Sequence, residues 1–294
     1  MADYHEMENM TKKKRLGISL LGLIISVACL FYVFRDIDAD KLLQILSRAD
    51  LWLVLPLLIA YGLYYWVKAV RWRLLLKPLT QTTTKTIIPA MMMGFFANNI
   101  LPAHLGEFIR MYLGAKVLQV KNSQVLATII LERIFDILVI VWFLTFALIF
   151  IPKLPLIFTQ IGIFAGAIGL LLVTLLVVSL AWGKFILKGV RKLLFLCPKT
   201  LAEKMTQQIN LGISGFQAIR SPVLLSGIVF TSVLQWLLMG ICIYCSLLAV
   251  GIHEHYSVAI LVLCCMVFAG TIPSAPGFFG VFQVAYLISL SPFG

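Results

Sequence analysis

The sequence predicts an all-α protein, a polytopic membrane helical bundle whose chain is interrupted by two re-entrant or broken helix hairpins in an inverted repeat. Of the 294 residues, 61% are hydrophobic and only 12% are charged, and the mean hydropathy is +1.01. A soluble domain of this length would carry about twice that charged fraction. Several apolar runs approach or exceed the ~20 residues that cross a bilayer as a helix. Residues 1–294 are therefore expected to form a single integral membrane domain.

The first predicted span covers about 16–34 and follows the basic run Lys12-Lys13-Lys14-Arg15. No small-x-small cleavage site follows before Arg35, so this span is expected to stay in the protein with the N-terminus in the cytoplasm. Leucines and isoleucines at helical spacing within 42–46 predict a short amphipathic helix at the membrane surface.

The second predicted span covers about 51–67 and ends in a cluster of basic and aromatic residues. Lys68, Arg71, Arg73 and Lys77 stand there beside Trp66 and Trp72. Aromatic rings next to basic side chains are typical of a membrane–water boundary. Further apolar segments are predicted at about 87–101, 123–151, 156–182, 223–250, 258–272 and 277–290. Residues 183–222 are predicted to form a basic amphipathic loop.

Loop charges predict the topology. Residues 1–15 hold four basic side chains, 68–86 hold five and 183–222 hold seven, so all three segments are expected in the cytoplasm. Three full crossings between 86 and 183 would put the last of them outside. The conflict disappears if 87–101 enters the membrane and returns on the same side. This reasoning predicts a re-entrant hairpin in a multi-pass protein of the cell (plasma or inner) membrane.

The stretch at 95–110 differs most from its apolar surroundings. It contains the amides of Asn98 and Asn99, the backbone-breaking Pro102 and Gly106, and the charged Glu107. Broken backbone is tolerated inside a bilayer only where protein or a wet cavity surrounds it. We therefore expect this stretch to be the functional centre.

The same pattern recurs near the end of the chain. Pro102, Gly106, Phe108, Tyr112 and Leu113 are matched at identical spacing by Pro276, Gly280, Phe282, Tyr286 and Leu287. Two broken elements of opposite orientation are how many secondary transporters build a midplane site. Two unrelated kinked helices would give the same sequence pattern.

These motifs resemble the lysylphosphatidylglycerol synthase transmembrane region family, the flippase domain of multiple peptide resistance factor. The resemblance covers almost the whole chain and is carried by Arg71-Trp72, 98–102, Gly106-Glu107 with Arg110, Glu132-Arg133 with Asp136, and 273–280. It implies a membrane unit that translocates or handles lipids, without the soluble aminoacyl-transferase domain of the bifunctional relatives. The family pattern has an acidic residue where Gln283 stands, which weakens the expected charge of the second copy. The repeat also leads us to expect a further span after Gly294, so the chain is either a shortened version or part of a longer one.

The candidate site is a set of ionisable residues that are expensive inside a bilayer and should pair or face water. Glu107 and Arg110 are three residues apart, and Glu132 and Asp136 are four apart, so each pair shares a helix face. Arg110 and Arg133 suit a phosphate, because a guanidinium fork matches its oxygens. The carboxylates would receive a cationic headgroup or a coupling proton. A structural network of salt bridges is a compatible alternative interpretation. The full predicted substrate-binding set is Asn98, Asn99, Pro102, Gly106, Glu107, Arg110, Glu132, Arg133, Asp136, Pro276, Gly277, Gly280 and Gln283.

The predicted function is that of a flippase-like lipid transporter for a phospholipid or a polyprenyl- or glycan-linked lipid. The alternative is a membrane-embedded transferase or transferase subunit, in which His104 beside Glu107 could act as a general base. No catalytic residue, cofactor or metal is assigned: the Cys242-x-x-Cys245 pair reads as helix interior, and no nucleotide-binding loop is present. Membrane lipids are the expected partners, with anionic headgroups on the basic loops and no nucleic acid despite the net charge of +12. A homo-oligomer and a soluble enzyme partner are both compatible with the sequence.

Overall fold

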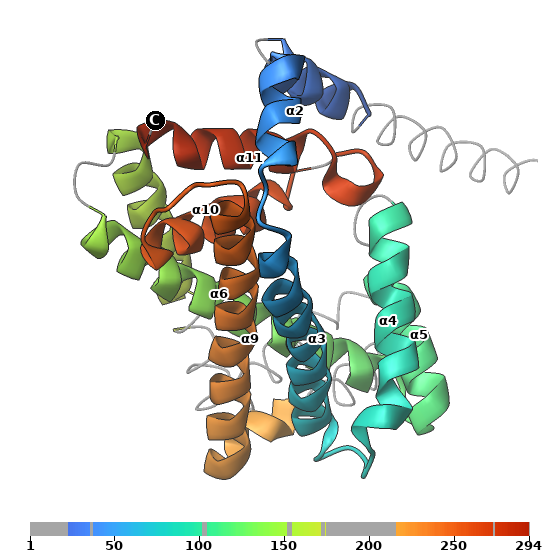
Figure 1. Cartoon of the computed structure of the whole chain (residues 1–294). Coiled ribbons are helices and arrows are strands. Elements are labelled where there is room, and N and C mark those ends of the chain that lie inside the picture. Colours follow the sequence, from blue (N-terminus) through green and yellow to red (C-terminus); the bar gives the residue numbers. More distant parts are fainter. Residues whose placement is uncertain are drawn as a thin grey trace, which may run out of the picture.

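The computed structural model describes residues 23–35, 38–101, 105–151, 155–171, 174, 216–272 and 274–293. Every regular element in these residues is helical, which confirms the all-α prediction (Figure 1). The beginning of the first predicted span, Pro102, His104 and the greater part of loop 183–222 lie outside the described residues.

The labelled α-helices of Figure 1 are α2 (Ala39–Ser47), α3 (Val54–Leu76), α4 (Thr84–Ile100), α5 (Gly106–Leu118), α6 (Asn122–Phe150), α9 (Pro222–Ala249), α10 (Tyr256–Ala269) and α11 (Val281–Leu290). Short 3-10 helices are η1 (Leu51–Leu53), η3 (Phe216–Arg220), η4 (Pro276–Phe278) and η5 (Ser291–Phe293). Two further apolar helices are Leu23–Phe34 and Leu156–Leu171.

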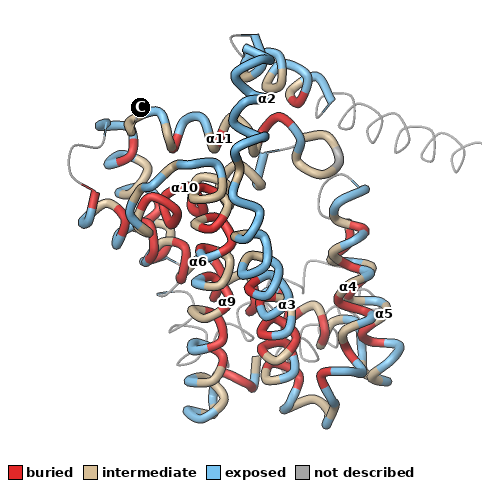
Figure 2. The backbone as a smooth tube through the Cα atoms, in the orientation of Figure 1, coloured by how far each residue is buried: buried red, intermediate tan, exposed pale blue. Residues whose placement is uncertain are grey.

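In the described part of the chain, three helices are long and apolar enough to cross a membrane: Leu51–Leu76, Asn122–Phe150 and Pro222–Ala249. The shortest of them has 26 residues, a length of about 39 Å at the rise of an α-helix, which exceeds the ~30 Å of a hydrocarbon core. Within this set α3 and α9 form the most extensive helix pair, and they run side by side in Figure 1. The end of α3 near α2 exposes Leu55, Leu58 and Ile59 (Figure 2), which suits a surface covered by lipid chains.

Among the residues that the structure describes, the buried apolar side chains form two clusters. The first is built mainly from α6, α9 and α10 and includes Ile140, Phe143 and Ile243. The second is built mainly from α3, α4 and α6 and includes Leu75 and Ile129. Along α6 the second cluster ends at Phe135 and the first begins at Val139. On α6 the buried Asp136 lies between the last residue of the second cluster and the first residue of the first cluster.

The first broken element is a tight helical hairpin. Helices α4 and α5 pack closely and antiparallel, since Gly94 lies against Arg110 and Gly106 lies against both Gly94 and Asn98. A Cβ atom on Gly106 would overlap the carbonyl oxygen of Gly94, and one on Gly94 would lie 2.6 Å from the Cβ of Arg110. Glycine at these two positions therefore permits the close approach of the helices. The hairpin returns the chain to the end of the bundle from which α4 began.

The second broken element follows α10. Gly277 and Gly280 both have positive φ angles, +77° and +86°, so the chain turns sharply before α11 begins at Val281. Its short helix η4 packs against α4, which brings the two broken segments together. Gly106 and Gly280, matched in the sequence repeat, both stand at the start of a helix. The inverted orientation of the two copies stays a prediction.

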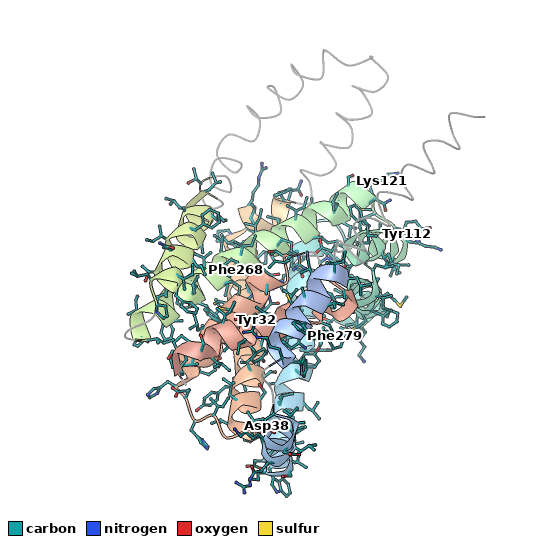
Figure 3. All side chains as sticks on the ribbon, turned by 90° about the horizontal axis from the view of Figure 1, so that it is seen from above. Tyr32, Asp38, Tyr112, Lys121, Phe268 and Phe279 are labelled. Carbon is teal, nitrogen blue, oxygen red and sulfur yellow. The ribbon has the colours of Figure 1, made fainter. Side chains whose placement is uncertain are left out.

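The N-terminal helix Leu23–Phe34 covers this second element. Ser26 Oγ accepts a hydrogen bond of 2.7 Å from the backbone N–H of Ala275, and a Cβ on Gly280 would lie 2.5 Å from the carbonyl oxygen of Ser26. Figure 3 shows the helix and the segment beneath it at the labels Tyr32 and Phe279. The closeness of this packing explains why glycine occupies position 280.

The second span differs from the prediction at its C-terminal end. Helix α3 continues to Leu76 instead of ending near residue 67, and Lys68, Arg71 and Trp72 are all buried inside the bundle. Trp72 is therefore not an interfacial residue, and Lys68 and Arg71 are not loop charges. The basic residues of 68–86 that remain outside the core are Arg73, Lys77 and Lys85.

Candidate functional site

A layer of charged and polar side chains lies inside the bundle, beside buried residues of both apolar clusters. It is assembled from four helices: Lys68 and Arg71 of α3, Glu107 and Arg110 of α5, Glu132, Arg133 and Asp136 of α6, and Ser232, Gln235 and Trp236 of α9. We call these ten residues the polar layer. Within each helix, members that are three or four residues apart share one face.

Arg110 and Glu132 form the strongest pair of the polar layer. The guanidinium donates two parallel hydrogen bonds to the carboxylate, Nη2 to Oε2 at 2.7 Å and Nη1 to Oε1 at 3.2 Å. The guanidinium carbon of Arg110 also lies 4.0 Å from the ring centroid of Trp72. Both charged residues are at most 1% exposed. Removing one partner of such a buried pair typically costs about 3–5 kcal/mol, because the other charge is left unpaired.

Arg71 connects two carboxylates of α6. Its Nη1 donates to Asp136 Oδ1 at 2.7 Å and to Ser232 Oγ at 3.1 Å, and its Nη2 lies 3.2 Å from Glu132 Oε1. Glu132 is thus shared by Arg71 and Arg110. This shared carboxylate joins α3, the hairpin helix α5 and α6 at one point.

Asp136 is the anchor for α9. Its Oδ1 accepts hydrogen bonds from Gln235 Nε2 at 2.6 Å and Trp236 Nε1 at 3.0 Å, in addition to the one from Arg71. Its Oδ2 is buried and lies 3.6 Å from Arg133 Nη1 without a hydrogen bond among the described groups. The carboxylate is held by α3 and α9 through one oxygen and retains an open acceptor on the other.

The edge of the polar layer is partly exposed. Arg133 Nε lies 2.8 Å from Glu107 Oε1, with side chains 40% and 27% exposed. Solvent-exposed ion pairs are worth only about 0–1 kcal/mol. This outer pair therefore closes the hairpin against α6 weakly, while the pair of Arg110 and Glu132 holds it firmly.

The structure brings together the five charged residues that the sequence singled out, although in different pairs from their helical neighbours. Arg110 binds Glu132 across the helix interface and Glu107 binds Arg133, rather than Glu107 binding Arg110. The prediction that Glu132 and Asp136 share a face agrees with their common burial.

The two asparagines behave differently from each other. Asn98 lies beside Gly106, and its buried Oδ1 has no hydrogen-bond partner among the described residues. Asn99 instead donates from Nδ2 to the carbonyl oxygen of Phe95 at 3.1 Å, within its own helix. Pro102 lies outside the described residues.

The second copy of the repeat, at 276–287, forms a backbone turn and contains no charged side chain. Gln283 Oε1 accepts a 2.7 Å hydrogen bond from the N–H of Gly280, so its side chain caps α11. Gly277 and Gly280 form the turn before that helix, and the side chain of Pro276 lies outside the described groups. Among the described contacts, none joins these residues to the polar layer.

Sequence reasoning missed half of the polar layer. The neighbouring tryptophans predict a membrane boundary at Lys68 and Arg71, although Tyr64, Lys68 and Arg71 show the four- and three-residue spacing of one helical face. Ser232, Gln235 and Trp236 show the same spacing inside an apolar span. An intramembrane face of this kind is the signal that could have revealed them.

The fold and the polar layer define an α-helical membrane protein with a buried charged site. The family model for the lysylphosphatidylglycerol synthase transmembrane region matches residues 19–294, and the chain belongs to this family. A UPF0104 membrane protein of Methanothermobacter thermautotrophicus is 23% identical over 290 residues, which cover 94% of this chain and 83% of the relative.

Two more relatives match about half of the chain. A UPF0104 membrane protein of Methanocaldococcus jannaschii is 27% identical over 139 residues, covering 46% of this chain and 41% of the relative. One from Pyrococcus horikoshii is 26% identical over 134 residues, covering 44% and 40%. No solved structure matches the chain.

Proposed function

We propose that this protein binds the headgroup of a membrane lipid in its polar layer and moves that headgroup between the two leaflets. The observation that carries the proposal is the amount of charge held inside an apolar bundle. The charged side chains buried among apolar residues are Lys68, Arg71, Arg110, Glu132 and Asp136. Ionisable residues at this depth are costly and usually mark the path of a substrate.

Binding of a lipid headgroup accounts for the polar layer better than a purely structural role does. Replacing a buried ion pair by apolar residues of similar volume often leaves the stability of a protein unchanged or raises it. The polar layer also keeps unused groups, among them Arg71 Nε, Arg110 Nε and Asp136 Oδ2. These donors and acceptors are available to a phosphate and to the polar groups attached to it.

The hairpin of α4 and α5 is the element that we propose to move. It is attached to α6 through the buried pair of Arg110 and Glu132 and the outer pair of Arg133 and Glu107. A phosphate competing for Arg110 would loosen the first attachment and let the headgroup pass. We place the protein in the cell membrane with its N-terminus in the cytoplasm, in agreement with the distribution of loop charges.

Translocation in proteoliposomes tests this function. Purified protein is reconstituted with a trace of lipid carrying a fluorophore on its acyl chain, and the fraction that an impermeant reductant quenches is followed with time. We expect the wild-type protein to expose inner-leaflet lipid faster than protein-free vesicles do. Arg110→Gln should slow this step strongly, because the guanidinium fork is lost.

Arg73→Gln is the matched control, because this substitution removes the same charge from the exposed side of α3. It should translocate lipid like the wild type. Equal rates for wild-type vesicles and protein-free vesicles, with every lipid and ion gradient tried, would overturn the proposed function.

A further inference from the structure

Lys68 lies in the polar layer without a carboxylate partner. Its side chain is buried, and no carboxylate oxygen of the described residues lies within 4.0 Å of Nζ. The ammonium carries three donors, and the structure gives it one acceptor among the described groups, Tyr64 Oη at 3.3 Å. Two of its donors are therefore unmatched in the described part of the chain.

Aromatic rings surround this ammonium. Nζ lies 5.1 Å from the ring centroid of Tyr64 and 4.8 Å from that of Phe95. The guanidinium carbon of Arg110 lies 5.6 Å from the same Phe95 ring. Cations near ring faces are stabilised in their charged form. The Phe95 ring is thus close to two buried cations, Lys68 and Arg110, near the C-terminal end of α4.

The charges of the polar layer do not balance. Four cations, Lys68, Arg71, Arg110 and Arg133, face three carboxylates, Glu107, Glu132 and Asp136, which leaves one positive charge in excess. An uncompensated charge in an apolar interior is strongly unfavourable. A bound ligand with one negative charge would neutralise the layer.

Tyrosines on one face of α3 connect this position to the outside of the bundle. Tyr61 is exposed, and its hydroxyl lies 2.9 Å from that of Tyr65. The Tyr65 ring contacts both Tyr64 and Phe95, with centroids 5.1 and 5.7 Å apart. Hydroxyls and ring faces thus lead from the lipid-facing surface to Lys68.

We infer that Lys68, Tyr64 and Phe95 form the phosphate subsite of the polar layer and that this subsite selects lipid phosphodiesters of net charge −1. The inference rests on the proposed function and names its substrate class. A zwitterionic headgroup returns a cation to the layer and leaves the excess charge in place. A phosphomonoester carries about −1.5 to −2 charges and overcompensates it.

Lipid binding to purified protein tests the subsite. Wild type and variants are titrated in detergent with phosphatidylglycerol and with phosphatidylcholine of identical acyl chains, and the bound lipid is counted by native mass spectrometry. We expect the wild type to bind phosphatidylglycerol about tenfold more tightly, as one charge-assisted contact allows. Lys68→Gln should remove this preference and Lys68→Arg should keep most of it. Arg73→Gln, with the same loss of charge on the exposed side of α3, should leave it unchanged.

Inorganic phosphate separates a lipid site from a site for the free anion. Millimolar phosphate could raise the melting temperature of the wild type but not that of Lys68→Gln, while the wild type shows no preference between the two lipids. This result would assign the subsite to free phosphate and overturn the lipid inference. Equal affinity of the wild type for both lipids, or an unchanged preference in Lys68→Gln protein of wild-type melting temperature, would also overturn it. Translocation by Lys68→Gln with the same headgroup preference as the wild type would contradict only the subsite, whereas a wild type that translocates no lipid would contradict the function on which it rests.

Discussion

At the scale of single residues, Glu132 is the carboxylate that the two buried arginines Arg71 and Arg110 share. Its carboxylate accepts two hydrogen bonds from Arg110, and its Oε1 lies 3.2 Å from Arg71 Nη2. If Glu132 is lost, Arg71 still donates hydrogen bonds to Asp136 and Ser232. Arg110 has no second carboxylate partner among the described contacts. The consequences of losing Glu132 should therefore fall mainly on Arg110.

Glu132→Leu should lower the free energy of unfolding in detergent by about 3–5 kcal/mol, because Arg110 would stay buried without its partner. Arg110→Met combined with Glu132→Leu removes both charges, so most of the loss should be recovered. Chemical unfolding of the single and double variants measures the difference. A double variant less stable than Glu132→Leu would contradict the direct pairing of these two residues.

At the scale of elements, the hairpin of α4 and α5 depends on backbone contact as much as on charge. The carbonyl oxygen of Gly94 occupies the place where a Cβ of residue 106 would stand. The helices can approach this closely only without side chains at both positions. That distance also sets the reach of Arg110 toward Glu132, so packing and ion pairing in the hairpin are coupled.

Gly106→Ala should separate the hairpin helices and destabilise the protein by about 1–3 kcal/mol, the usual effect of overpacking. Gly62 in α3 has no atom within 4 Å of the corresponding position, so Gly62→Ala should instead stabilise the helix by roughly 0.5–1 kcal/mol. Melting temperatures of the two variants in the same detergent should move in opposite directions. A shift of the same sign and size in both would show that the contact between α4 and α5 is not tight.

At the scale of the whole molecule, the hairpin fixes which ends of the helices share a side. The connection after α3 and the turn at Gln119 should lie on one side of the membrane, because α4 and α5 run out and back. Helix α2 lies at the opposite end of α3 (Figure 1). The count of loop charges predicts that the connection after α3 and the turn at Gln119 lie on the cytoplasmic side.

Accessibility of single cysteines tests this arrangement. Thr80→Cys and Gln119→Cys should react with an impermeant maleimide only after the cytoplasmic face is opened, whereas Asp40→Cys should react in intact cells. The unsubstituted protein, with its six native cysteines, supplies the background. Labelling of Thr80→Cys and Gln119→Cys from opposite sides would show that α4 and α5 do not form a re-entrant hairpin.

The sequence was sufficient for the parts of this structure that depend on local pattern. Apolar runs predicted the helices, and the broken backbone around Gly106 predicted the hairpin. The charges within 107–136 stood out because nothing else explains them in an apolar segment. The tryptophans beside Arg71 are equally typical of a membrane boundary and of a core, so only its helical spacing with Tyr64 and Lys68 indicates a buried position. Gln235 reaches Asp136 from 99 residues away, a contact that only the packing of α9 on α6 determines.

The position of the lipid phosphate tests the central claim most directly. An experimental structure of the protein in a lipid nanodisc should show a phosphate inside the bundle, within about 2.7–2.9 Å of donor nitrogens as charge-assisted hydrogen bonds require, on Lys68, Arg71 or Arg110. Phosphates confined to the bilayer surfaces, with the polar layer closed by protein and water alone, would contradict it.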